Sequence, residues 1–225
     1  MGELVQFQWN GKTASGYLAV PREKGSGVIV IQEWWGLVPH IKNVADRFAA
    51  EGFVALAPDL YHGKSTKSPD EAGKLMMAMH IDEAEKELRG AVSHVLAHPQ
   101  TSSKHAGTVG FCMGGALSLF AASKNPDVGA CVVFYGGHPS VKPDLANLKA
   151  PVLGFYAERD SFVTPASARE LEKQLKAFGK RIEIHIYPNT SHAFFNDERP
   201  EVYNKQAAQD AWDRVIRFFK KELGA

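Results

Sequence analysis

The stretch GTVGFCMGGALSLF, residues 107–120, changes from an apolar run into a helical pattern around a G-x-C-x-G motif. Gly107–Phe111 predicts a buried strand, and Gly114–Ser123 predicts a helix. Glycines two residues before and two after Cys112 remove the side chains that would clash in such a tight turn. The turn would hold the Cys112 sulfur above a sheet at a helix N-terminus, which favours a thiolate. This pattern predicts a thiol nucleophile; the alternative is a small buried cysteine in a closely packed turn.

Outward from this turn, strand and helix patterns alternate along the chain. Leu4–Trp9 and Thr13–Val20 predict a hairpin, because Asn10-Gly11 between them suits a two-residue turn with positive φ at both positions. The alternation predicts the α/β class, with a mostly parallel central sheet, helices on both faces and the antiparallel hairpin at one edge. Further strands are expected at Val28–Ile31, Phe53–Ala57, Ala130–Tyr135, Val152–Tyr156 and Ile182–Tyr187, helices at His40–Glu51, Ile81–Ala97, Pro165–Phe178 and from about Glu201 to Leu223, and a looser methionine-rich segment at Thr66–Met79.

Length and composition limit the class of protein. A chain of 225 residues, with 44% hydrophobic and 23% charged residues, fits one α/β domain over residues 1–225. The net charge is +1 and no basic run is present, so nucleic acid is not an expected partner. We expect no membrane span and no signal peptide. With two cysteines, the chain is expected in the reducing cytoplasm, as a monomer or, alternatively, a homodimer.

Two loops after late strands supply a candidate acid and base. In sheets of this kind, sites gather at the carboxyl ends of strands, and the expected chain order is nucleophile, acid, base. Asp160 and His192 each follow one of the last two expected strands. We predict that His192 is the general base and that Asp160 orients it. Glu158 and Asp59 are rival acids, although Asp59 is expected to cap a turn.

The remaining cysteine and a histidine pair are expected to be structural. Cys131 lies in the middle of an apolar strand, where a buried thiol is the ordinary interpretation. His94 and His98 have the i, i+4 spacing of a helical metal site, but no third ligand is near, so they are expected at the surface. We expect no metal and no organic cofactor, since triad chemistry requires neither.

Five motifs, in order and on the expected elements, resemble the dienelactone hydrolase family, whose type enzyme is carboxymethylenebutenolidase. The resemblance covers nearly the whole chain. It implies an α/β-hydrolase fold and a triad of Cys112, Asp160 and His192. The motifs are Gln32-Glu33-Trp34-Trp35-Gly36, Ala57-Pro58-Asp59-Leu60-Tyr61, Gly110-Phe111-Cys112-Met113-Gly114-Gly115, Glu158-Arg159-Asp160-Ser161-Phe162-Val163 and Ser191-His192-Ala193-Phe194.

The resemblance also assigns roles to the loop after the first parallel strand. In the family, the glutamate at Glu33 holds the resting thiol and helps to generate the thiolate when substrate binds. A carboxylate near a thiol suppresses its ionisation, which is compatible with that role. The alternative is that Glu33 caps a local turn. The oxyanion hole is expected from the backbone N–H groups of Met113 and Trp34.

The chain departs from the family at two arginines that bind a substrate carboxylate. Pro69 stands at one position and Asn196, a candidate pocket residue, at the other. Lys67, Lys74 and Arg199 are near, but a lysine lacks the planar bidentate fork of an arginine. Acceptance of a dienelactone is therefore open, whereas the hydrolytic machinery is complete.

The sequence thus predicts a hydrolase that cleaves an ester or lactone of a small molecule through a thioester acyl-enzyme. A thioesterase or another acyl-transfer hydrolase on the same site is one alternative. A non-catalytic, redox-sensing thiol or a binding module is the other. Candidate pocket walls are Trp34, Trp35, Tyr135 and the methionines Met76, Met77 and Met79, which could equally belong to the core.

Overall fold

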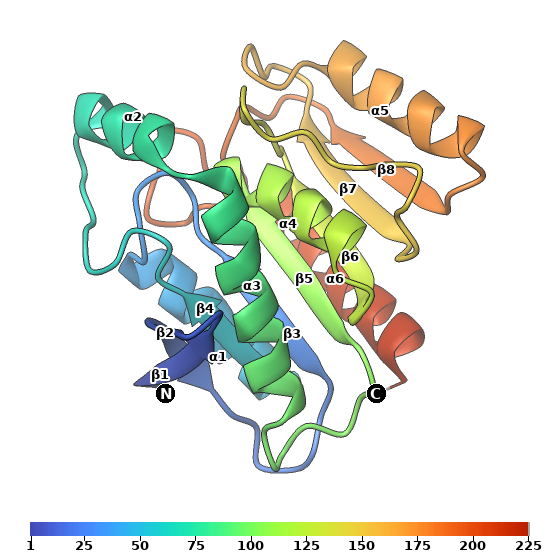
Figure 1. The fold of residues 1–225 in the computed structure, drawn as a ribbon. Coiled ribbons are helices and arrows are strands. Elements are labelled where there is room, and N and C mark those ends of the chain that lie inside the picture. Colours follow the sequence, from blue (N-terminus) through green and yellow to red (C-terminus); the bar gives the residue numbers. More distant parts are fainter. Residues whose placement is uncertain (225) are drawn as a thin grey trace.

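The computed structural model describes residues 1–224 and is a β-sheet between two layers of helices (Figure 1). The strands found in these residues are β1 (Glu3–Trp9), β2 (Lys12–Ala19), β3 (Gly27–Ile31), β4 (Val54–Pro58), β5 (Ala106–Phe111), β6 (Val128–Phe134), β7 (Val152–Ala157) and β8 (Ile182–Tyr187). The helices are α1 (Pro39–Ala50), α2 (Pro69–Ala78), α3 (Ile81–Leu96), α4 (Met113–Lys124), α5 (Pro165–Ala177) and α6 (Lys205–Leu223).

The strands lie in the order β1-β2-β4-β3-β5-β6-β7-β8. The first two pairs, β1 with β2 and β2 with β4, are antiparallel, and all later neighbours are parallel. Asn10 and Gly11 have φ of 44° and 73°, and Trp9 pairs directly with Lys12, as a two-residue hairpin turn requires. The α/β class and the N-terminal hairpin predicted from the sequence are confirmed.

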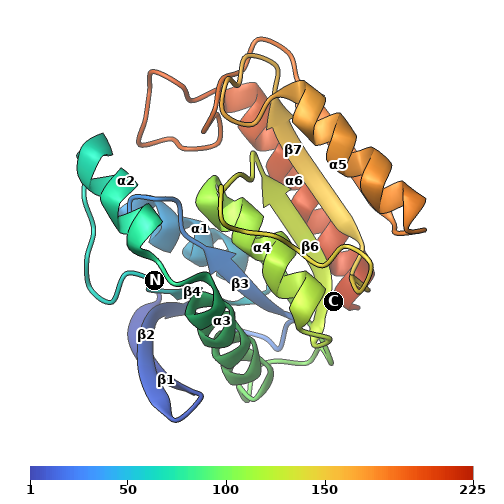
Figure 2. The ribbon, with the colours of Figure 1, turned by 45° about the horizontal axis from the view of Figure 1, so that its top comes forward.

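Helices cover both faces of the sheet (Figures 1 and 2). The buried side chains of α1 and α6 form one apolar layer with the sheet, and those of α3, α4 and α5 form the other. Every residue of β3 and β5 is buried, which is why these central strands are continuously apolar rather than alternating. None of the helices in the described part of the chain combines the length and apolar character that a membrane crossing requires.

Three segments differ from the sequence-based expectation. The looser segment at Thr66–Met79 contains the helix α2, which begins after Ser68, whose side chain accepts a hydrogen bond from the amide of Glu71. The last helix begins at Lys205 rather than near Glu201, because the Asn204 side chain caps it. Strand β6 ends before Tyr135, which has a φ of 39° and leaves the extended conformation.

The turn from β5 into α4 lies directly against the end of β3. A Cβ atom at Gly114 would stand 2.4 Å from the carbonyl oxygens of Ile31 and Gln32. A Cβ atom at Gly110 would stand 1.9 Å from the carbonyl oxygen of Gly114. Both glycines are therefore required by close backbone approach, and this approach ties the turn to the neighbouring strand.

We expect Gly114→Ala to lower the free energy of unfolding by about 1–3 kcal/mol or more, because the added methyl group forces backbone atoms apart. Gly73→Ala in α2 is the matched control, since nothing lies within 4 Å of the added Cβ. Removal of a helical glycine should stabilise the protein by about 0.5–1 kcal/mol. Urea unfolding measures both changes. Equal effects of the two substitutions would contradict the close packing of this turn.

Candidate active site

Cys112 occupies the turn between β5 and α4 in a conformation that few residues adopt. Its φ is 54° and its ψ is −119°, outside the favoured regions for a residue with a side chain. Neighbouring backbone groups hold it there. Its amide donates to the carbonyl oxygen of Phe134 at 3.0 Å, and its carbonyl oxygen accepts from the amides of Gly115 at 3.0 Å and Gly137 at 3.2 Å. The side chain, half-buried, is thereby presented at the carboxyl edge of the sheet and the N-terminus of α4.

Asp160 and His192 form a hydrogen-bonded pair on the loops after β7 and β8. The Nδ1 atom of His192 lies 2.6 Å from Oδ2 of Asp160. The other oxygen of Asp160 accepts from the amides of Phe162 at 2.8 Å and Val163 at 2.9 Å. Because Asp160 is fully bonded and buried, it fixes the ring of His192 and leaves Nε2 free to act.

Asp160 and His192 each shift the pKa of the other. Burial disfavours the charge of Asp160, but the bond and charge of His192 and the two backbone amides outweigh it and hold the pKa of this carboxyl below its usual value. Burial likewise lowers the pKa of His192, yet hydrogen bonds and negative charge from Asp160 and Cys112 outweigh it and raise this pKa to about 10. A pKa of about 10 favours the protonated imidazole of His192 across the neutral range.

The acid and base loops are joined to each other by several hydrogen bonds. The amide of Glu158 donates to the carbonyl oxygen of Tyr187 at 3.1 Å, and the amide of Arg159 donates to that of Thr190 at 2.9 Å. The Glu158 carboxylate accepts from the amide of Asn189 at 2.8 Å. Glu158, weighed from the sequence as a rival acid, thus holds the base loop. Asp59, the other rival, accepts from two amides of its own turn, as expected.

Glu33 is buried at the carboxyl end of β3 and is held by Asn196. Asn196 Nδ2 donates to Glu33 Oε2 at 2.7 Å, and both side chains are almost fully buried. Within residues 1–224, Oε1 of Glu33 has no hydrogen-bond partner. Burial raises the pKa of Tyr135, and the charges of Glu33 and Cys112 raise it further. Asn196 therefore lies behind Glu33 and does not face the cavity.

Two backbone amides near Cys112 are available to a substrate oxygen. Met113 begins α4, and Trp34 lies on the loop after β3, so the close approach of these two elements brings both amides to the same edge of the sheet. No hydrogen-bond acceptor for either amide is found among residues 1–224. Unpaired amides at a helix N-terminus and on the facing loop are suited to bind a developing oxyanion.

A cavity of about 800 Å³ opens over Cys112 and His192. Of the pocket candidates named from the sequence, Trp34, Trp35 and Met76 line it. Tyr135 and Asn196 do not, because both are buried. Met77 and Met79 do not line it either, since Met77 is exposed and Met79 lines a different cavity. Arg199 lines the cavity over Cys112, but Lys67 and Lys74 do not. His138, whose place after the Ala130–Tyr135 strand allows it to line the site, does line the cavity. Lining residues that the sequence did not indicate are Pro69, Gly137, Pro139, Arg159, Ser161, Phe162, Val163, Ser191 and Val202.

Phe162 lines the cavity, although the sequence analysis did not name it as a pocket residue. Its side chain is 83% exposed, and its ring lies edge-on to that of His192 at 5.7 Å. Phe162 belongs to the motif around Asp160. Its place two residues after Asp160 is the signal in the sequence that could have indicated a position at the cavity. Among residues 1–224, no group of three or more His, Cys, Asp and Glu side chains is arranged to hold a metal ion.

Comparison with known proteins identifies the family to which this chain belongs. A family model described as the dienelactone hydrolase family matches residues 14–223. The chain belongs to the dienelactone hydrolase family. As a dienelactone hydrolase family member it is a hydrolase that acts on esters or lactones of small molecules.

Relatives match this dienelactone hydrolase family member over almost the whole chain. "Protein usf" of Aquifex pyrophilus is 42% identical, with 99% of this chain and 100% of the relative covered. A "Putative carboxymethylenebutenolidase" of Aquifex aeolicus is 37% identical over the same shares. The crystal structure named "Putative Dienelactone Hydrolase" from Klebsiella pneumoniae has 28% identity and a TM-score of 0.88, covering 97% of this chain and 98% of that chain. The α/β-hydrolase fold expected from the motifs is thereby confirmed.

We expect His192→Gln to move the pH dependence of Cys112 alkylation by iodoacetamide to higher pH. In the wild type, the raised pKa of His192 keeps a cation beside the sulfur, and this cation is lost only as the pH rises through about 10. Without this cation, alkylation should require a higher pH than in the wild type. Mass spectrometry of quenched samples measures the profile. Cys131 is the internal control, because burial raises its pKa to about 11.

Identical alkylation profiles in the wild type and in His192→Gln would contradict the pairing of thiolate and imidazolium. Circular dichroism of the variant checks that the fold is retained, since a loosened site would expose Cys131 to the reagent as well.

Proposed function

We propose that this protein hydrolyses a small-molecule ester or lactone by nucleophilic catalysis, with Cys112 forming a thioester acyl-enzyme. The 2.6 Å bond between His192 Nδ1 and Asp160 Oδ2 carries this proposal. It supports the tautomer in which Nε2 exchanges protons with the sulfur and the leaving group. Family membership supplies the reaction class, and these contacts support the choice of residues.

The reaction would proceed in two halves. The Cys112 thiolate attacks the carbonyl carbon, and the oxyanion is stabilised by the amides of Met113 and Trp34. The carbon–oxygen bond then breaks as Nε2 of His192 gives its proton to the leaving alkoxide or enolate. In the second half, Nε2 takes a proton from water, the hydroxide attacks the thioester, and the acid leaves as the thiolate returns. Loss of one oxyanion donor in such sites typically costs ~10²–10³ in rate.

Glu33 would restrain the thiol between turnovers. Its carboxylate is buried at the end of β3, with one oxygen bound by Asn196 and the other without a partner among residues 1–224, and its charge raises the pKa of Tyr135. A buried carboxylate of this kind disfavours a thiolate beside it, and substrate would relieve the repulsion by displacing it. This role would protect the resting sulfur from oxidation.

The cavity supports a substrate with an apolar body and an anionic end. Trp35, Met76 and Phe162 form apolar walls, and Arg199 stands at the same cavity with its guanidinium 5.7 Å from the Trp35 ring. Arg199 would take the place of the family arginines that Pro69 and Asn196 replace. A free catalytic thiol requires a reducing compartment, so we propose that the protein acts in the cytoplasm.

Steady-state hydrolysis of a p-nitrophenyl ester and of a dienelactone tests the proposal. We expect Cys112→Ala to lose at least about 10³-fold in kcat/KM, because removal of a nucleophile leaves only binding and oxyanion stabilisation. Cys131→Ala is the matched control and should keep the activity, since Cys131 is buried in β6 away from the cavity. Activity retained by Cys112→Ala would refute the mechanism.

The same measurements separate the alternatives. Faster cleavage of a thioester than of either oxygen ester would favour a thioesterase. Stoichiometric reaction of Cys112 with peroxide, without turnover of any ester, would favour a redox-sensing thiol.

We expect Arg199→Gln to raise KM for an anionic ester by about tenfold, because charge-assisted hydrogen bonds contribute roughly 1.5–3 kcal/mol before solvent screening at this half-exposed position. The matched neutral ester on the same variant is the control, and its KM should stay within about twofold. Equal changes for both esters would show that Arg199 shapes the cavity and does not bind an anionic end.

A further inference from the structure

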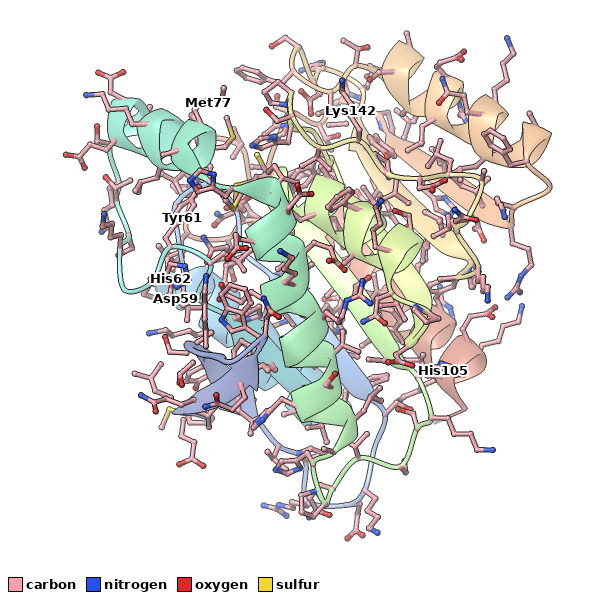
Figure 3. The ribbon with its side chains drawn as sticks, viewed as in Figure 1. Asp59, Tyr61, His62, Met77, His105 and Lys142 are labelled. Atoms are coloured by element: carbon pink, nitrogen blue, oxygen red, sulfur yellow. The ribbon has the colours of Figure 1, made fainter. Side chains whose placement is uncertain are left out.

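A second cavity, of about 390 Å³, lies on the other side of α2 from the substrate cavity. It is enclosed by the β1–β2 hairpin, the loop after β4, the end of α2 and the beginning of α3. Figure 3 shows the loop residues Asp59, Tyr61 and His62 together between the hairpin and α3. The two cavities share no lining residue in the described part of the chain. The family chemistry described above gives this cavity no role.

Two buried polar atoms at this cavity lack partners. Oε1 of Glu87, a residue only 2% exposed, and Nε1 of Trp9, only 6% exposed, make no hydrogen bond within residues 1–224. The other oxygen of Glu87 has a distant contact, 3.7 Å, with Nε2 of the exposed His62. Buried carboxyl and indole groups are almost always hydrogen-bonded in native proteins. Both residues line the cavity, so a bound molecule could satisfy them.

The charges around Glu87 favour a cation as that molecule. The Asp59 carboxylate lies nearby, but its oxygens are already taken by the amides of Tyr61 and Gly63. Burial and the charge of Asp59 raise the pKa of Glu87 to about 8. The basic residues that line the cavity are Lys12, His62, Lys64 and His80. Among the described residues, only His62 has a charged contact with Glu87, and that contact is long. A cation beside Glu87 would therefore offset both the cost of burying its charge and the repulsion from Asp59.

The walls favour an organic cation over a metal ion. Trp9, Leu60, Leu75 and Met79 supply aromatic and aliphatic surface. The described residues offer no set of three or more His, Cys, Asp and Glu side chains with a metal-binding arrangement. The ring of Trp9 already attracts a cation, since Lys12 Nζ lies 4.9 Å from the ring centre. The charge of Lys12 is already paired with Glu83 at 2.7 Å.

We propose that this second cavity binds a small organic ammonium ion, with its nitrogen on the Glu87 carboxylate and its hydrocarbon body against Trp9, Leu60 and Met79. Helix α2 presents Met76 to the substrate cavity and Leu75 to this one, and Met79, the residue after α2, also lines this cavity. The Tyr61 hydroxyl, at the back of the second cavity, donates to the sulfur of Met113 at 3.4 Å. A ligand here would therefore pack against the wall of the catalytic site without entering it.

Isothermal titration calorimetry with benzylammonium chloride tests this site. We expect 1:1 binding to the wild type that strengthens about tenfold per pH unit between pH 6 and 7, because Glu87 must release its proton to the solvent as the cation binds. Glu87→Gln, which is isosteric with the neutral acid and should keep the fold, is expected to lose binding at least tenfold. Glu85→Gln is the matched control, since Glu85 lies on the same helix, pairs with Arg89 and does not line the cavity.

Two further titrations test which cavity the ligand occupies and whether its positive charge is needed for binding. Alkylation of Cys112 by iodoacetamide should leave the affinity unchanged, because the cavities are separate. Benzyl alcohol, the neutral counterpart, should bind at least tenfold more weakly. Absence of binding to the wild type, equal binding by Glu87→Gln, equal binding of benzyl alcohol or loss of binding after alkylation would each overturn the proposal.

Discussion

The close approach of the β5–α4 turn to the end of β3 is the constraint on which the site depends. It is possible because Gly110 and Gly114 have no side chains, and it allows Cys112 to keep a φ of 54°. The same approach brings the first amide of α4 next to the loop that carries Glu33 and Trp34. One backbone contact thus positions the Cys112 thiol, the Glu33 carboxylate and the amides of Met113 and Trp34, which have no acceptor among residues 1–224. The strain at Cys112 is offset by the hydrogen bonds around it.

The remaining members of the site depend on the parallel sheet. Because β7 and β8 run parallel to β5, their carboxyl ends meet at the same edge, and the loops that follow them can contact each other and the thiol. The acid loop and the base loop are bonded to one another through Glu158 and Arg159, so His192 is held from two sides. The electrostatics then follow from this geometry. Asp160 stays charged, and its charge and that of the sulfur stabilise the imidazolium.

The features that could be predicted from the sequence are those formed by neighbouring residues or located at the ends of strands. The hairpin, the glycines around Cys112 and the order of Asp160 and His192 could be predicted because each depends on a few adjacent residues. The bond between Asn196 and Glu33 could not, since it joins residues 163 positions apart and both are buried. The same holds for Tyr135, which was expected in the pocket but lies beneath it, and for the second cavity, whose walls come from four elements.

The central claim, that Cys112 carries the acyl group, is tested most directly by mass spectrometry of the protein quenched within milliseconds of mixing with an ester. The account predicts that the acyl mass appears on the peptide containing Cys112 and is removed by hydroxylamine at neutral pH. In the His192→Gln variant, an activated ester should still acylate Cys112, and the acyl-enzyme should then accumulate. An acyl group on another residue, or full turnover with no acylated protein at any time, would contradict it.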